Sequence, residues 1–189
     1  MSPKVGLPGG RGQGIGHAAR EGTRTHRRWA WTLVVPLAAL VLAWVFLAEP
    51  MRVSSTSMLP TLVPGDRVLV DKVTYRFRDP RRGELVVFHP PVGGGLALKR
   101  VVALPGDRVG VRDGVLVVNG RQVRESYVDY ESVDASFFGP VTVPAGRIFV
   151  MGDRRANSED SRVYGPVPQD DILGRAELVV WPPGRVGSP

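Results

Sequence analysis

The segment Val115-Leu116-Val117-Val118-Asn119-Gly120-Arg121-Gln122-Val123 predicts a β-hairpin. Both central residues of a type I′ turn need positive φ, and Asn and Gly adopt it at low cost. From Met51 onward, β-branched runs of this kind alternate with Gly, Pro and Asp, and no helical periodicity competes with them. The expected strands are Arg67–Lys72, Glu84–His89, Leu96–Leu104, Arg108–Arg112, Val115–Asn119, Arg121–Arg124, Arg147–Met151 and Ile172–Val180. We therefore expect a mainly β domain over residues 49–189.

One part of this domain interrupts the strand pattern. Residues 125–146 contain Tyr127, Tyr130, Phe137 and Phe138 but no regular alternation. They are expected to form an irregular excursion, either a smaller β subdomain or a flap. With the hairpin they make an insertion at about residues 106–146.

An uncharged apolar run precedes the domain. Residues 29–48 read WAWTLVVPLAALVLAWVFLA, and twenty helical residues span about 30 Å, the thickness of the hydrocarbon core of a bilayer. A cleaved signal sequence would have a shorter apolar core and small residues before the cut, whereas Phe46-Leu47-Ala48-Glu49 is a poor cleavage site. The sequence predicts a single transmembrane helix.

Charge predicts the orientation of that helix. Residues 1–28 hold six basic residues and only Glu21, a net charge of +5, whereas the whole chain carries +7. Basic flanks stay in the cytoplasm, so we expect a disordered cytoplasmic tail, a plasma-membrane anchor and an extracytoplasmic domain. The remaining charge of about +2 argues against a nucleic-acid partner. Since the chain has no Cys, the domain must be stabilised by a packed core.

The serines after the apolar run need a base to become nucleophilic. His17 and His26 precede the run, which leaves His89 beside Pro90-Pro91 as the one histidine in the serines' compartment. A lysine is the better candidate, because burial lowers the pKa of an amine. Lys99 is expected to share an apolar strand face with Ala97, Val101 and Ala103, whereas the alternative Lys72 lies at a solvated strand end.

Four motifs then occur in order: Ser55-x-Ser57-Met58-x-Pro60-Thr61, Arg82-Gly83-Glu84-Leu85-Val86-Val87-Phe88, Lys99-Arg100-Val101-Val102-Ala103-Leu104-Pro105-Gly106-Asp107, and Gly152-Asp153-x-Arg155-x-Asn157-Ser158-x-Asp160-Ser161-Arg162. Together they resemble the four boxes of bacterial type I signal peptidases, from about Arg52 to Pro183. The serine box alone is moderately specific and the second box is weak. The order of all four behind an anchor carries the resemblance.

The resemblance implies a Ser-Lys mechanism. Ser57 would attack the scissile carbonyl, and Lys99 would be the general base that later protonates the leaving amine. The backbone N–H of Ser57 and the hydroxyl of Ser55 would form the oxyanion hole, although hydroxyl residues are also common in turns. Ser158 would hydrogen-bond to the Lys99 amine and orient it.

Further residues of the resemblance concern support and specificity. It implies ion pairs between Asp153 and Arg100 and between Asp160 and Arg162, which would hold the Lys99 strand against the last motif. Arg154 and Ala156 depart from the usual Asn and Asp, which affects the packing of this loop rather than the dyad. The remaining matches are apolar residues that could line a shallow substrate pocket and are equally plausible core residues: Val53, Met58, Leu62 and Leu98.

The implied function is the removal of signal peptides from exported preproteins after small-x-small sites. The signal peptide and the bilayer would be the partners, with no metal or cofactor. Two alternatives stay open: a specialised Ser-Lys processing peptidase, such as a pilin processor, and a non-enzymatic extracytoplasmic β module. A self-cleaving repressor would need a DNA-binding domain where this chain has its apolar run.

Overall fold

The computed structural model describes residues 32–39, 47–130, 133 and 136–189. The chain divides into two units, Met1–Ala43 and Trp44–Pro189. In the first unit, residues 32–39 are helical. Within the described ranges, no helix has both the length and the apolar character needed to cross a membrane. The expected tail and half of the expected anchor lie outside the described residues, and Ala48, the last residue of the apolar run, already begins a strand.

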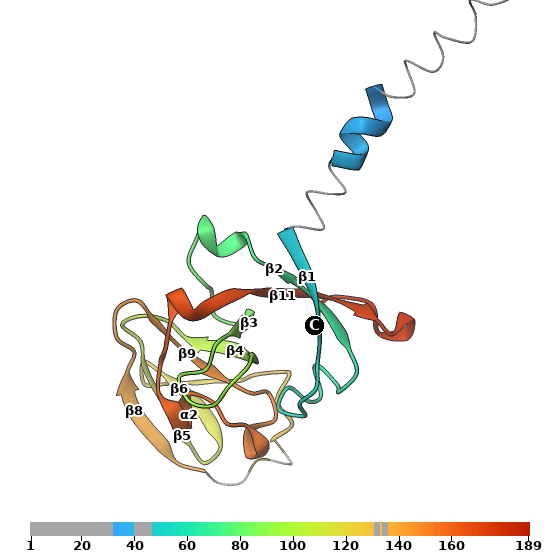
Figure 1. Ribbon diagram of the computed structural model, residues 1–189. Coiled ribbons are helices and arrows are strands. Elements are labelled where there is room, and N and C mark those ends of the chain that lie inside the picture. Colours follow the sequence, from blue (N-terminus) through green and yellow to red (C-terminus); the bar gives the residue numbers. More distant parts are fainter. Residues whose placement is uncertain (1–31, 40–46, 131–132, 134–135) are drawn as a thin grey trace, which may run out of the picture. The chain divides into compact units, whose positions relative to one another are not determined.

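Two antiparallel sheets make up the second unit (Figure 1). The larger sheet has the order β1-β2-β11-β3-β4-β9-β10. Its strands are β1 (Ala48–Arg52), β2 (Arg67–Asp71), β3 (Leu85–Phe88), β4 (Ala97–Ala103), β9 (Arg147–Met151), β10 (Val167–Pro168) and β11 (Ile172–Trp181). The smaller sheet has the order β7-β6-β5-β8, with β5 (Arg108–Arg112), β6 (Val115–Val118), β7 (Arg121–Val123) and β8 (Phe138–Thr142).

Short helical turns complete this unit. They are η1 (Thr74–Arg76), η3 (Arg155–Asn157), α2 (Ser161–Tyr164), η4 (Gln169–Asp171) and η5 (Pro183–Arg185). The mainly β prediction is confirmed, and all eight expected strands are present with ends that differ by at most one residue. The hairpin is also confirmed, because Asn119 and Gly120 have φ of 54° and 80° and Val118 pairs with Arg121.

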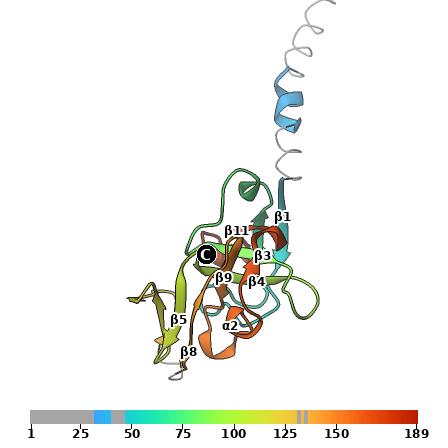
Figure 2. The same cartoon turned by 90° about the vertical axis from the view of Figure 1, so that its left-hand side faces the viewer.

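The smaller sheet is an insertion between two neighbouring strands of the larger one. β4 and β9 pair directly, although β5 to β8 lie between them in sequence. The two connections run side by side, since Gly106 N donates to Val143 O at 2.9 Å and Val143 N donates to Asp107 O at 2.9 Å. Both views place the start of β1 at the end of this unit remote from β5 and β8 (Figures 1 and 2).

An apolar cluster joins the two sheets. β4 and β9 contribute Val102, Ala103, Phe149 and Met151, and the smaller sheet contributes Val109, Val111, Leu116 and Val118. A register shift between Val101 and Ala103 interrupts the alternation of β4. The expected shared face of Lys99 and Ala103 is therefore wrong, because Ala103 packs beside Val102, while Val101 packs in another cluster with Val86 and Val150.

Candidate active site

Ser57 lies in the loop between β1 and β2, in a tight turn. Leu59 N donates to Thr56 O at 3.2 Å and Leu62 N donates to Met58 O at 2.9 Å. The serine is only 6% exposed. Its carbonyl oxygen accepts a hydrogen bond of 3.0 Å from Arg154 N, so the serine loop is tied to the loop that follows β9.

Lys99 lies within β4, between β3 and β9, and its Nζ is 2.6 Å from Ser57 Oγ. The side chain is buried. Burial lowers the pKa of Lys99; the negative charges of Asp160 and Glu159 oppose this shift, Arg162 adds to it and Asp153 opposes it. The structure thus brings the predicted nucleophile and the predicted base into hydrogen-bond contact, in surroundings that favour a neutral amine.

The alternative bases are placed elsewhere. Lys72 is exposed and forms an ion pair with Glu49 of β1. His89 follows β3 and is exposed. The hydroxyl of Ser57 contacts Lys99 instead.

The two predicted oxyanion groups are adjacent and bonded to each other. Ser57 N donates to Ser55 Oγ at 3.2 Å, which is long for such a bond. Ser55 is exposed at the edge of the site. Its hydroxyl hydrogen is therefore available to a second acceptor.

Ser158 is close to the serine loop, but the expected bond to Lys99 is not made. Its Oγ is buried and has no hydrogen-bond partner within the described part of the chain. The serine loop and the loop that carries Ser158 are crowded at Gly152. A Cβ at this position would lie 2.6 Å from Ser158 Cβ and 2.6 Å from Ser57 O. Only glycine allows the loop to pack this closely.

Both predicted ion pairs are present. Arg100 Nε and Nη2 donate to Asp153 at 2.9 and 2.8 Å, and Arg162 Nη2 donates to Asp160 at 2.8 Å. Asp160 also accepts the Gly152 amide at 3.0 Å, which fixes the start of the loop. The two departures from the family pattern, Arg154 and Ala156, have exposed side chains, so these side chains do not enter the packing of the site.

Sequence reasoning missed three supporting residues, which are Thr61, Tyr127 and Glu125. Thr61 Oγ1 donates to Asp153 Oδ2 at 2.6 Å, and the ring of Tyr127 lies over the Arg100 guanidinium at 3.8 Å. Glu125 and Arg155 form a buried ion pair at 2.6 Å. These partners lie far apart in sequence, and the one local signal was the position of Thr61 inside the first motif.

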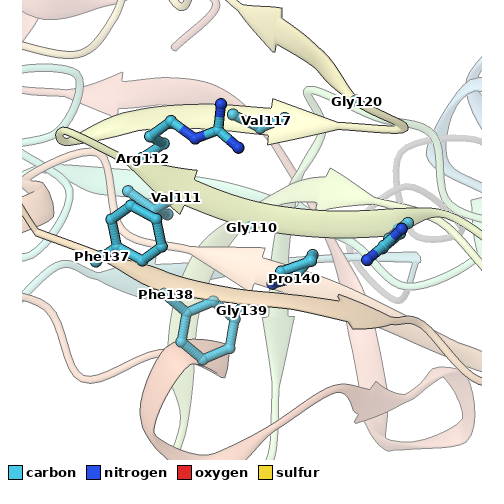
Figure 3. Close-up of a pocket in the computed structure, with 10 residues that line it drawn as sticks. Gly110, Val111, Arg112, Val117, Gly120, Phe137, Phe138, Gly139 and Pro140 are labelled. Atoms are coloured by element: carbon cyan, nitrogen blue, oxygen red, sulfur yellow. The ribbon is translucent and has the colours of Figure 1, made fainter.

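The four proposed pocket residues pack in one core cluster. Val53 and Leu98 keep 6% and 8% of their surface exposed, Met58 keeps 2%, and Leu62 has none. Leu62 therefore lies behind any pocket rather than on its surface. A separate hollow of about 200 Å³ on the smaller sheet is lined by Phe137, Phe138, Pro140 and Val117, among others, and by none of the predicted site residues (Figure 3).

The chain also resembles known proteins. Residues 26–181 match the family described as signal peptidase, peptidase S26. A probable signal peptidase I-1 of Synechocystis is 42% identical, with 82% of this chain and 83% of the relative aligned. Signal peptidase I of Leptolyngbya laminosa is 42% identical over 76% of this chain and 73% of its own length. Signal peptidase I T of Bacillus subtilis is 35% identical, covering 87% and 90%. The chain belongs to the signal peptidase family, peptidase S26.

Proposed function

We propose that this chain is a membrane-anchored serine endopeptidase that removes N-terminal signal peptides from exported preproteins through a Ser57-Lys99 dyad. The observation that carries the dyad is the 2.6 Å contact between Ser57 Oγ and a buried Lys99 amine. Family membership and relatives named signal peptidase I support the activity.

Lys99 acts as the base because its surroundings favour the uncharged amine. The neutral amine accepts the hydroxyl proton of Ser57 while Oγ attacks the scissile carbonyl. The resulting ammonium then protonates the nitrogen of the departing mature protein. In the second half of the reaction Lys99 takes a proton from water, which hydrolyses the acyl-enzyme.

The oxyanion that forms during attack is held by the Ser57 N–H and the Ser55 hydroxyl. These groups share one weak hydrogen bond at rest. A charged oxygen is a stronger acceptor than a neutral hydroxyl, so both donors turn to it as charge develops. One such donor is typically worth about 3 kcal/mol to the transition state.

Ser158 orients the Lys99 amine after Ser57 Oγ has lost its proton and bonded to the scissile carbonyl carbon. Its buried Oγ lacks a partner within the described residues and lies beside the Ser57 carbonyl. A hydroxyl in this place can accept a hydrogen bond from the ammonium. This assignment requires the Ser158 hydroxyl to come within hydrogen-bond distance of Lys99 Nζ during the reaction.

Substrate selection follows from the apolar cluster below the serine. Val53 and Leu98 reach the surface, while Met58 and Leu62 close the space behind them. A shallow apolar surface accepts Ala and excludes larger side chains, which suits small-x-small sites. The apolar run at residues 29–48 would anchor the protein in the membrane that holds its substrate.

Cleavage of a preprotein with an Ala-x-Ala site tests the proposal. The purified, detergent-solubilised protein should cut after the second Ala, as shown by sequencing the new N-terminus. Ser57→Ala and Lys99→Ala should each lower kcat by a factor of about 10³ or more. Lys72→Ala is the matched control and should keep full activity. Cleavage that survives in Lys99→Ala would assign the base to another residue.

A further inference from the structure

The segment after β7 meets the site through two residues, Glu125 and Tyr127. The carboxylate of Glu125 lies 2.6 Å from Arg155 Nη1, and both side chains are 2% exposed. Tyr127 Oη donates to Glu125 Oε1 at 2.6 Å, and its ring lies over Arg100 with 3.8 Å between the guanidinium carbon and the ring centroid. Tyr127 therefore joins both arginines, one through its ring and one through Glu125.

The ring contact is of the kind that orients a cation. A guanidinium within about 6 Å of an aromatic centroid is attracted to the ring face, more strongly where water is excluded. Arg100 is 6% exposed and is held between the ring, the Gly83 carbonyl oxygen at 2.8 Å and the Asp153 carboxylate. Removing the ring opens one side of this arrangement.

Arg100 in turn connects the two reacting residues. It follows Lys99 on β4, and its partner Asp153 accepts from Thr61 Oγ1 at 2.6 Å in the serine loop. Asp153 is followed by Arg154, whose amide donates to Ser57 O at 3.0 Å. A shift of Arg100 thus changes the separation of Ser57 and Lys99, and rates fall steeply with such shifts.

We propose that Tyr127 is a positioning residue for the Ser57-Lys99 pair, acting through Arg100 and Asp153. The proposal rests on the proposed peptidase function. It gives the insertion between β4 and β9 a role in catalysis, because this segment supplies the ring.

The same chain contains a matched control. Tyr75 Oη donates to Glu84 Oε2 at 3.1 Å, and the centroid of its ring lies 5.7 Å from the guanidinium carbon of Arg78. Arg78 also forms an ion pair with Glu84. Within the described part of the chain, no side-chain hydrogen bond or ion pair links this second group of tyrosine, arginine and glutamate to Ser57 or Lys99. Its loss should affect stability without affecting chemistry.

The test compares full-length variants on a soluble peptide with an Ala-x-Ala site. Tyr127→Leu should lower kcat about tenfold, with KM within twofold. Tyr127→Phe keeps the ring and should keep kcat within about threefold, and Tyr75→Leu should leave kcat unchanged. Thermal unfolding of each variant separates loss of structure from loss of positioning.

A second substitution covers the case in which Tyr127→Leu does not fold. Pentafluorophenylalanine in place of Tyr127 keeps the shape of the ring but withdraws electron density from its face, so kcat should fall below that of Tyr127→Phe. Equal kcat in these two variants, or unchanged kcat in a folded Tyr127→Leu, would overturn the proposal. Failure of the wild-type protein to cleave would instead contradict the proposed function.

Discussion

Lys99 is a residue whose chemistry is set by its surroundings. Burial lowers its pKa, and carboxylates nearby limit the shift. Below that pKa the amine is protonated and cannot accept the serine proton. We therefore expect kcat/KM to rise with pH through the lowered pKa, by up to about tenfold per pH unit, and to level off above it. A pH profile of peptide cleavage checks this, and a flat profile from pH 5 upward would contradict a lysine base.

Asp160 offers a way to move this profile. Its charge is the largest influence that raises the pKa of Lys99 against burial. Asp160→Asn keeps an oxygen to accept the Gly152 amide but removes the charge, so the rising limb of kcat/KM should shift to lower pH. Glu159→Gln should shift it in the same direction by less, since Glu159 is exposed. A shift to higher pH in either variant would contradict this account.

The site residues differ in how far the sequence could predict them. Ser57 and Lys99 stand in motifs whose order carries information, and both charged pairs connect residues of those motifs. Tyr127 and Glu125 stand in a segment without a motif, and their contacts depend on how the insertion folds back. Local patterns do not encode such contacts. The pocket residues were ambiguous because apolar side chains serve a core and a pocket equally well.

At the scale of elements, the close approach of two loops makes Gly152 sensitive. A methyl group there would collide with Ser158 and the Ser57 carbonyl. Gly152→Ala should lower kcat by at least about tenfold, because the serine loop must shift. It should also lower the melting temperature. Gly184→Ala is the control, since no atom lies within 4 Å of its added Cβ, and both effects should be absent there. Full activity in Gly152→Ala would show that the loops yield without moving the dyad.

Three strands escaped prediction for related reasons. β1 starts inside the apolar run and contains Pro50, β8 contains Gly139-Pro140, and β10 has two residues. Each is an edge strand of its sheet, where pairing on one side suffices and proline is tolerated. Such strands need no alternating apolar pattern. The central strands were predictable because they are buried.

For the whole molecule, the division into two units yields a prediction. Removal of residues 1–43 leaves the unit Trp44–Pro189, which contains both sheets and the site. The shortened protein should keep its melting temperature and cleave a soluble peptide within about threefold of the full chain. Cleavage of a preprotein in lipid vesicles should fall at least about tenfold, because enzyme and substrate are no longer concentrated in one membrane. Equal activity of both forms on vesicles would contradict an anchoring role.

The position of β11 within the larger sheet affects when the site can form during synthesis. This strand follows the other described strands in sequence, yet it lies between β2 and β3 and pairs with both. Until residues 172–181 have emerged, the sheet has no strand to join the half that carries the serine loop to the half that carries Lys99. A nascent chain that ends before this strand would thus hold Ser57 and Lys99 apart. The two residues come together only after β11 has taken its place between β2 and β3, so the site depends on a strand that is made after both of them.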